Sequence, residues 1–169
     1  MKDQKKISVL FVCMGNICRS PMAEGMFRHA IKTADLETQV HIDSAGTHSY
    51  HIGSPPDARA QQASKKRGVD ISDLRSRLVT DKDFAHYDYI LVMDGANHNN
   101  LIGRAPPQYH SKIRRLLSFS RKYPNLDVPD PYYGGTPGFE ENLDMIHDAV
   151  RHLVLEISGK AGQAIRSAE

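Results

Sequence analysis

The sequence predicts an α/β protein in which helices cover both faces of a parallel sheet. Apolar runs of strand length alternate along the chain with segments whose apolar residues recur at three- and four-residue spacing. Such alternation is typical of strand-helix-strand units with parallel strands. Ligands of these folds bind beyond the carboxyl ends of the strands, so the loops that follow the strands are the expected place for function.

Four stretches are predicted as strands. The first ends at Cys13, and the others span about 39–45, 87–93 and 112–117. The run YDYILVM is the clearest buried strand, because it is continuously apolar after its first residues and stops at Asp94-Gly95.

Helices are predicted between these strands from periodicity and end signals. The first is expected to open with Ser20 as cap and Pro21 as first helical residue, and to run to about Thr33. A second follows Asp57 and stops at Gly68. The later ones are a short turn at 80–84, a short helix at 96–102 and a long amphipathic helix at 139–157 with a fraying tail from about Ser158.

Length and composition indicate one globular domain, residues 1–169, with flexible ends at about 1–6 and 160–169. The chain has 169 residues, of which 40% are hydrophobic and 25% charged. A net charge of +2 gives no reason to expect a nucleic-acid partner. The apolar run after MKDQKK is too short for a secretion signal, and none approaches the length of a membrane span. A cytoplasmic protein that does not bind membranes is therefore expected.

The loop after the first strand has the composition of an anion site. Its sequence is CMGNICRS, in which Gly15 and Asn16 tolerate unusual backbone angles. Inward-pointing N–H groups and a following helix N-terminus favour a phosphate-like dianion. Arg19 supplies a two-pronged donor for phosphoryl oxygens. Cys13, at the centre of this positive field, is expected to act as a thiolate nucleophile, although a buried apolar cysteine is the ordinary alternative.

Both cysteines of the chain, Cys13 and Cys18, lie in this loop. A disulfide between them would constrain little of the unfolded chain, so thiols in a reducing compartment are expected. Oxidation of Cys13 could then end in a reversible disulfide with Cys18. If a Cys18→Ser variant recovers from peroxide as fully as the parent, this hypothesis is wrong.

A thiolate that attacks a phosphoryl group needs a general acid for the leaving oxygen, and Asp130 is the best candidate. Pro129 and Pro131 stiffen the backbone around it, and Tyr132 and Tyr133 follow as possible walls for an aromatic leaving group. A carboxyl near a thiolate and a dianion is expected to stay protonated long enough to donate. By itself this segment is better interpreted as an Asp-Pro turn with exposed rings.

Together, CMGNICRSP at residues 13–21 and DPYY at residues 130–133 strongly resemble the low-molecular-weight protein tyrosine phosphatases. The resemblance covers nearly the whole chain. It implies a four-stranded parallel sheet in a three-layer doubly wound sandwich of flavodoxin-like topology, without metal or cofactor. The implied substrates are phosphotyrosine-containing proteins, and we expect a monomer.

The resemblance also implies roles for individual residues. Cys13 would form a phosphocysteine intermediate, Arg19 would stabilise the transition state, and Asp130 would act as acid and then as base. Ser20 would steady the thiolate, and Asn16 and Ser44 would hold the loop in shape. The substrate would be surrounded by Met14, Gly15, Asn16, Ile17, Cys18, Ser20, Tyr50, Tyr132 and Tyr133. His48 and His51 flank Tyr50 and make that wall less hydrophobic.

Other functions remain open on the sequence. Arsenate reductases of the thiol-relay type share the loop but need cysteines beyond Cys18. Protein arginine phosphatases typically carry Thr where this chain has Ile17. A phosphotyrosine-binding module could dispense with Cys13 or Asp130. As metal ligands, His48 and His51 have no third partner at an obvious spacing, and His147 and His152, five apart on a helix, do not share one face. No nucleotide-binding glycine motif is present.

Overall fold

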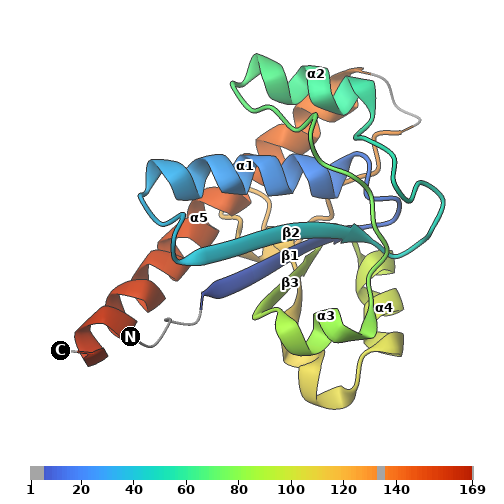
Figure 1. Cartoon of the computed structure of the whole chain (residues 1–169). Coiled ribbons are helices and arrows are strands. Elements are labelled where there is room, and N and C mark those ends of the chain that lie inside the picture. Colours follow the sequence, from blue (N-terminus) through green and yellow to red (C-terminus); the bar gives the residue numbers. More distant parts are fainter. Residues whose placement is uncertain (1–5, 133–135, 169) are drawn as a thin grey trace.

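The structure, a computed structural model, describes residues 6–132 and 136–168. Its centre is a parallel sheet of β1 (Ile7–Cys13), β2 (Val40–Gly46), β3 (Tyr89–Val92) and β4 (Ile113–Arg115) in the order β2-β1-β3-β4. The first strand in sequence thus lies inside the sheet, between β2 and β3 (Figure 1). This arrangement confirms the predicted doubly wound α/β fold with flavodoxin-like topology.

Helices cover both faces of the sheet. The helices α1 (Arg19–Thr33) and α5 (Thr136–Ala168) pack on one face, with α2 (Ala58–Lys66) outside them. The opposite face holds α3 (Asp81–His86) and α4 (Gly95–Arg104), followed by a 3-10 turn at Pro107–Lys112. In Figure 1, α1 and α2 lie above the strands, and α3 and α4 lie below them.

Each face of the sheet has its own hydrophobic core. Along β1, Val9 and Phe11 face the α1 and α5 side, whereas Leu10 and Val12 face the α3 and α4 side. All four are fully buried, as expected for an inner strand covered on both faces. The cores fix β1 firmly, and its carboxyl end carries Cys13.

Several predicted element ends differ from the structure. The expected cap at Ser20 is wrong: α1 begins at Arg19 after Cys18, because the Ser20 hydroxyl is bonded within the preceding loop and does not cap the helix. The fourth strand is only three residues long, since a 3-10 turn begins at Leu116. The last helix continues past Ser158 to Ala168.

Within residues 6–132 and 136–168, no helix is long and apolar enough to cross a membrane.

Candidate active site

The loop that joins β1 to α1 is held at nearly every residue by backbone bonds to neighbouring segments. Thr47 and His48 donate their N–H groups to the carbonyls of Cys13 and Met14, at 2.9 and 3.0 Å. Asp57 donates its N–H to the carbonyl of Ile17 at 2.8 Å. The Ser76 hydroxyl bonds the carbonyl of Gly15 at 3.0 Å. These bonds point the loop carbonyls outward and leave its N–H groups facing the interior of the turn.

Gly46, the last residue of β2, lets this loop pass very close to the sheet. It pairs with Cys13 in the register of the two strands. A Cβ at this position would lie 2.8 Å from the carbonyl oxygen of Met14 and 3.3 Å from the Asn16 backbone. Because backbone atoms cannot move aside cheaply, any larger residue would displace the loop.

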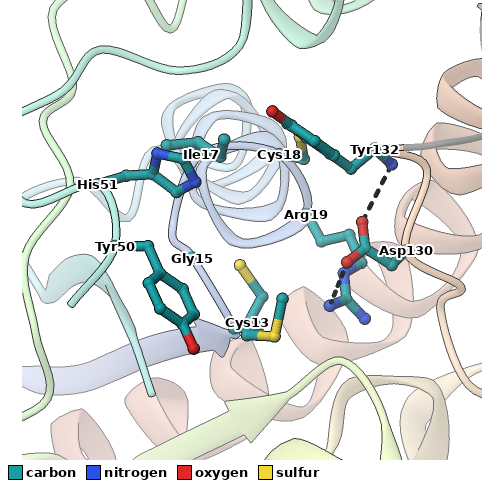
Figure 2. A pocket seen from close by; sticks show the side chains of 10 residues that line it. Cys13, Gly15, Ile17, Cys18, Arg19, Tyr50, His51, Asp130 and Tyr132 are labelled. Atoms are coloured by element: carbon teal, nitrogen blue, oxygen red, sulfur yellow. Dashed lines mark hydrogen bonds and ion pairs between the residues drawn. The ribbon is translucent and has the colours of Figure 1, made fainter. Parts of the chain in front are cut away.

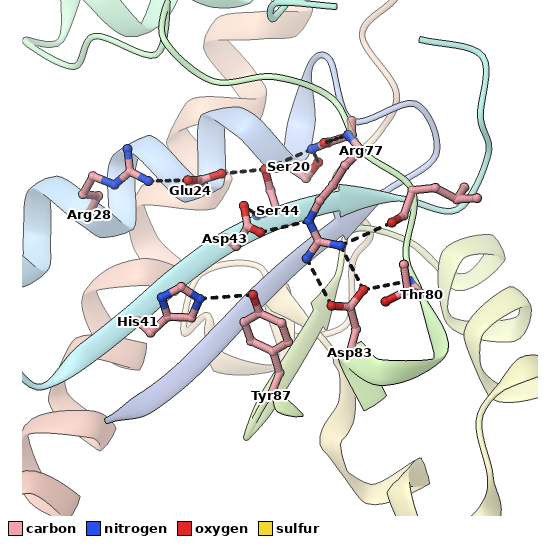
Figure 3. Close-up of polar contacts among 12 residues, drawn as sticks. Ser20, Glu24, Arg28, His41, Asp43, Ser44, Arg77, Thr80, Asp83 and Tyr87 are labelled. Carbon is pink, nitrogen blue, oxygen red and sulfur yellow. Dashed lines mark hydrogen bonds and ion pairs between the residues drawn. The ribbon is translucent and has the colours of Figure 1, made fainter. Parts of the chain in front are cut away.

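Asn16 is the bend of the loop. Its φ of 56° is in the left-handed region, which asparagine tolerates better than most residues, whereas Gly15 has no positive φ. At Gly15 the constraint is space, since a Cβ there would lie 3.0 Å from the His51 ring and the ring would have to shift. The Asn16 amide oxygen accepts the Arg77 N–H at 3.0 Å, which fixes the amide orientation. Arg77 is itself held by ion pairs to Asp43 and Asp83 (Figure 3).

The amide nitrogen of Asn16 donates hydrogen bonds to two hydroxyl groups that lie behind Cys13. Asn16 Nδ2 donates to Ser20 Oγ at 2.7 Å and to Ser44 Oγ at 3.0 Å. The Ser20 hydroxyl therefore has its proton free for Cys13 Sγ, 3.0 Å away. The sulfur also accepts the Asn16 N–H at 3.2 Å. Two donors thus converge on one sulfur atom.

Behind Ser44 this hydrogen-bonded chain ends at a buried acid, Glu24. The Ser44 hydroxyl donates to Glu24 at 2.6 Å, and Arg28 pairs with the same carboxylate from the surface (Figure 3). Burial raises the pKa of Glu24 to about 7, against the opposing effects of the Ser44 hydrogen bond and the Arg28 charge. The polar support behind Cys13 therefore includes a group that titrates near neutral pH.

Arg19 lies in the first turn of α1 with its side chain almost fully buried. Its Nη1 donates to Asp94 at 2.6 Å and to the carbonyl of Val128 at 3.0 Å. Its Nη2 is 3.8 Å from Asp130. Burial alone would lower the pKa of Arg19, but the charges of Cys13, Asp94 and Asp130 raise it overall. Asp94, which caps α4, thus aims the guanidinium toward the loop.

Cys13, Arg19 and Asp130 meet in one cavity of about 500 Å³. Figure 2 shows Cys13 and Arg19 below the loop and Asp130 entering from the segment that precedes α5. The cavity is lined by Cys13, Met14, Gly15, Ile17, Cys18, Arg19, Tyr50, His51, Asp130 and Tyr132. It combines a sulfur atom, a guanidinium and a carboxyl on a mainly apolar wall, and its size suits an aryl group.

The two aromatic walls are supported in different ways. Tyr50 is 71% exposed, and His48 stacks on its ring at 5.5 Å between centroids with 7° between the planes. On the other side, the Tyr132 N–H donates to Asp130 at 3.0 Å, and the Arg59 guanidinium lies 5.5 Å from the Tyr132 ring centre. Arg59 in turn is held by two bonds of 3.0 Å to Asp57.

Cys18 also lines the cavity but differs chemically from the first cysteine. Its side chain is buried, and burial, with a smaller effect of the Asp57 charge, strongly raises its pKa. Both cysteines are free thiols. Cys18 is therefore held as the protonated thiol at neutral pH.

The structure brings most of the residues proposed from the sequence to one place. Asn16, Ser20 and Ser44 lie behind the loop, and the others line the cavity, except Tyr133, which lies outside the described residues. Asp94, Arg59 and Glu24 were missed. Asp94 alone had a visible signal, since an acid directly after a buried parallel strand faces the ligand edge of the sheet. In the described part of the chain, no three His, Cys, Asp or Glu side chains group as a metal site.

Comparisons with known proteins agree on one family. The family model "Low molecular weight phosphotyrosine protein phosphatase" matches residues 8–163. A putative low molecular weight protein-tyrosine-phosphatase of Synechocystis is 43% identical over 152 residues, or 89% of this chain and 96% of the relative. The human low molecular weight phosphotyrosine protein phosphatase is 41% identical over 141 residues, or 83% and 89%. A protein tyrosine phosphatase of Entamoeba histolytica, with Hepes in its active site, superposes with a TM-score of 0.88 at 40% identity, covering 92% and 99%.

Proposed function

The chain belongs to the family of low-molecular-weight protein tyrosine phosphatases, and on that premise we propose that it hydrolyses phosphotyrosine through a phosphocysteine on Cys13. The observation that carries this proposal is the convergence of two hydrogen-bond donors on Cys13 Sγ, at the base of a cavity that Asp130 enters. A nucleophile, a cation and an acid that share one cavity are what phosphoryl transfer to a side chain requires.

In the first step the Cys13 thiolate attacks phosphorus, and the bond between phosphorus and the tyrosine oxygen breaks. The electron pair of that bond goes to the phenolic oxygen, which takes the proton of Asp130. Arg19 and the inward-facing loop N–H groups bind the equatorial phosphoryl oxygens, where charge is spread in the transition state. Asp94 acts as a positioning residue, because it holds Arg19 at 2.6 Å.

In the second step a water molecule attacks the phosphocysteine. Asp130, now a carboxylate, takes a proton from that water, and the phosphorus-sulfur bond breaks to give inorganic phosphate and the Cys13 thiolate. Ser20 and the Asn16 N–H again stabilise the sulfur as its negative charge returns. No metal or cofactor takes part in this scheme.

The substrate class follows from the cavity walls. Tyr50 and Tyr132 would pack on the phenyl ring of phosphotyrosine, and Ile17 would fill the space beside it. We therefore infer that phosphotyrosine proteins are the substrates. Separately, we propose that the enzyme is monomeric and cytoplasmic. The alternatives are an arginine phosphatase, a thiol-relay arsenate reductase and a non-catalytic binding module. The first two would use this cavity for another substrate, and the third would use it without catalysis.

Metal-free hydrolysis of p-nitrophenyl phosphate and of a phosphotyrosine peptide tests the proposal. We expect turnover by the parent, none by Cys13→Ser, and a kcat about 100- to 1000-fold lower for Asp130→Asn, which keeps the shape but cannot donate the proton. Glu141→Gln, which removes an exposed carboxyl on α5, is the control and should match the parent. Full activity of Cys13→Ser would refute the mechanism, and faster release of phosphate from phosphoarginine than from phosphotyrosine peptides would refute the substrate class.

A further inference from the structure

A second feature lies at the same edge of the sheet as the cavity just described. Residues 112–122, KIRRLLSFSRK, contain five Lys or Arg and no acid, although the whole chain has a net charge of only +2. The centre of this stretch is β4, where Arg114 and Arg115 are both exposed. β4 is an edge strand, so its outer side has no neighbouring strand in the described sheet.

These arginines line a hollow of about 370 Å³. Its other lining residues are His98, Ile113, Ser118, Pro124 and Asn125. Every polar side chain among them, Arg114 and Arg115 included, can donate a hydrogen bond, and none of them is an acid. One carboxylate, Asp127, holds Arg115 from outside the hollow at 3.3 Å. The hollow is therefore a cationic pocket in which the Asp127 carboxylate would compete with an incoming anion for Arg115.

The arginines are also held in place before any ligand arrives. The Arg114 guanidinium stacks on the Phe119 ring at 4.3 Å from the ring centre. Arg115 packs against Gly95, where an added Cβ would meet its guanidinium at 3.3 Å. Ordered side chains lose less entropy on binding than free ones.

The strand register relates this pocket to the nucleophile. Arg115 is paired with Val92, and Val92 with Val12, the residue before Cys13. Neighbouring strands are about 4.8 Å apart, so the backbone of Arg115 lies about 10 Å from that of Val12 at the same edge. The chain also links the two sites, since Asn125 precedes Asp130 by only five residues.

We propose that the pocket at Arg114 and Arg115 binds a second anionic group of the substrate, an acidic or phosphorylated side chain of the same polypeptide. This inference rests on the proposed phosphatase function. An extended peptide rises about 3.3 Å per residue, so about three residues span the 10 Å between the strands. The pocket thereby selects phosphotyrosines that lie within a few residues of further negative charge.

Two pairs of phosphotyrosine peptides test this selection. Each pair consists of a peptide with glutamates and a twin in which glutamines replace them. The glutamates lie three to five residues before the phosphotyrosine in one pair and three to five residues after it in the other. The measured quantity is the ratio of kcat/KM between twins, in which changes of the catalytic site itself cancel. The parent should prefer one acidic peptide about tenfold, mainly through KM, and the preference should shrink in high salt.

Three variants decide the origin of that preference. Arg114→Gln/Arg115→Gln should bring the ratio close to one, at about two- to fivefold per arginine. Asp127→Asn should raise it, because the competing carboxylate loses its charge. Arg121→Gln, in the same basic stretch but outside the pocket, should leave it unchanged. The double arginine variant should lower the ratio, whereas Asp127→Asn should raise it. A general loss of folding could not change the ratio in both directions.

Several results would overturn the proposal. If the parent hydrolyses p-nitrophenyl phosphate but its ratio between twin peptides is near one, the proposed second site is wrong and the proposed phosphatase function still stands. A preference that survives in the double variant, or falls equally in Arg121→Gln, would assign it to other charges. If the pocket takes only free anions, added sulfate would bind in the parent and not in the double variant, while the peptide ratio stays at one. A parent without aryl phosphatase activity would instead contradict the proposed function itself.

Discussion

The phosphate-binding loop (residues 13–19) and the acid segment (residues 128–132) meet at one cavity but are built differently. The loop is bonded to β2, to the segment at 76–77 and to the start of α2, with its residues close to fully buried at Cys13, Asn16 and Arg19. The acid segment is tied by the Val128 N–H to Met93, by the Val128 carbonyl to Arg19, and by the stacking of Arg59 on Tyr132. Asp130 itself remains about one-third exposed.

This difference matches the demands of the two chemical tasks. An anion cradle stabilises the transition state best when its donors need no rearrangement, which requires a rigid loop. An acid that first gives and later takes a proton must face two different oxygen atoms, which a lightly held segment allows. The following predictions separate the rigid part from the adjustable one.

The largest effect is expected in stability, and it concerns Glu24, the buried acid at the end of the hydrogen-bonded chain behind the loop. Glu24 has a pKa of about 7 in the folded protein against an ordinary value of 4.5. Below pH 4.5 the carboxyl is protonated in both states, and its full contribution to stability is present. As the pH rises to 7, the unfolded chain releases the proton first, so stability falls by roughly 3 kcal/mol. Glu24→Gln should abolish this loss.

The measurement is the free energy of unfolding by urea between pH 4.5 and 8. Glu24→Gln should gain on the parent as the pH rises, whereas Glu37→Gln, at an exposed position, should follow the parent curve. Parallel curves for parent and Glu24→Gln would show that the acid is already ionised at low pH.

Asn16→Ala tests the rigidity of the loop through turnover. The variant loses the bonds to Ser20, Ser44 and the Arg77 N–H and places alanine at a φ of 56°. We expect kcat to fall about 100-fold, since misplaced donors no longer match the transition state. Asn16→Gly accepts the same φ without strain, so it should recover stability but little activity. Recovery of both would assign the effect to the backbone alone.

Arg59→Met tests the acid segment in isolation. Arg59 stacks on Tyr132 and on Phe139, 5.5 and 4.9 Å from the ring centres, and so links the last residue of the acid segment to α5. We expect kcat/KM to fall about tenfold for phenyl phosphate and less than twofold for p-nitrophenyl phosphate, because only the poorer leaving group depends strongly on a well-placed acid. Arg59→Lys should give an intermediate result. An equal loss for both substrates would point to the phosphate loop instead.

Ser76→Ala should have the smallest effect. It removes the hydroxyl bond of 3.0 Å to the Gly15 carbonyl, one of several anchors of the loop. We expect a loss of about 1 kcal/mol in the free energy of unfolding and a change in kcat below threefold. A much larger drop in kcat would mean that the loop depends on single anchors and is less redundant than its many bonds suggest.

Local patterns were sufficient to predict much of this molecule. Alternating apolar runs gave the parallel sheet, and a short loop rich in special residues before a helix gave the anion cradle around Cys13. Proline on either side of Asp130 marked a constrained acid. Each of these signals is contained within a few neighbouring residues.

The remaining features depend on contacts between distant segments. Arg19 and Asp94 are 75 positions apart, and their pairing becomes visible only when β1 and β3 lie side by side. Glu24 reads as an exposed residue of a helix, yet its neighbours in space bury it. The Ser20 cap failed for a similar reason, since its hydroxyl serves Cys13 and Asn16 and not the helix backbone.

The order of the strands also sets how the sheet opens in solution. β1 has a partner on each side and pairs with β2 along its whole length, whereas β4 pairs over three residues and on one side only. Amide protons of β1 should therefore exchange with solvent only when the whole domain unfolds, while those of β4 exchange through local opening. Cys13 is thus expected at the end of the slowest-exchanging strand, whereas the cationic pocket lies on the strand that opens first.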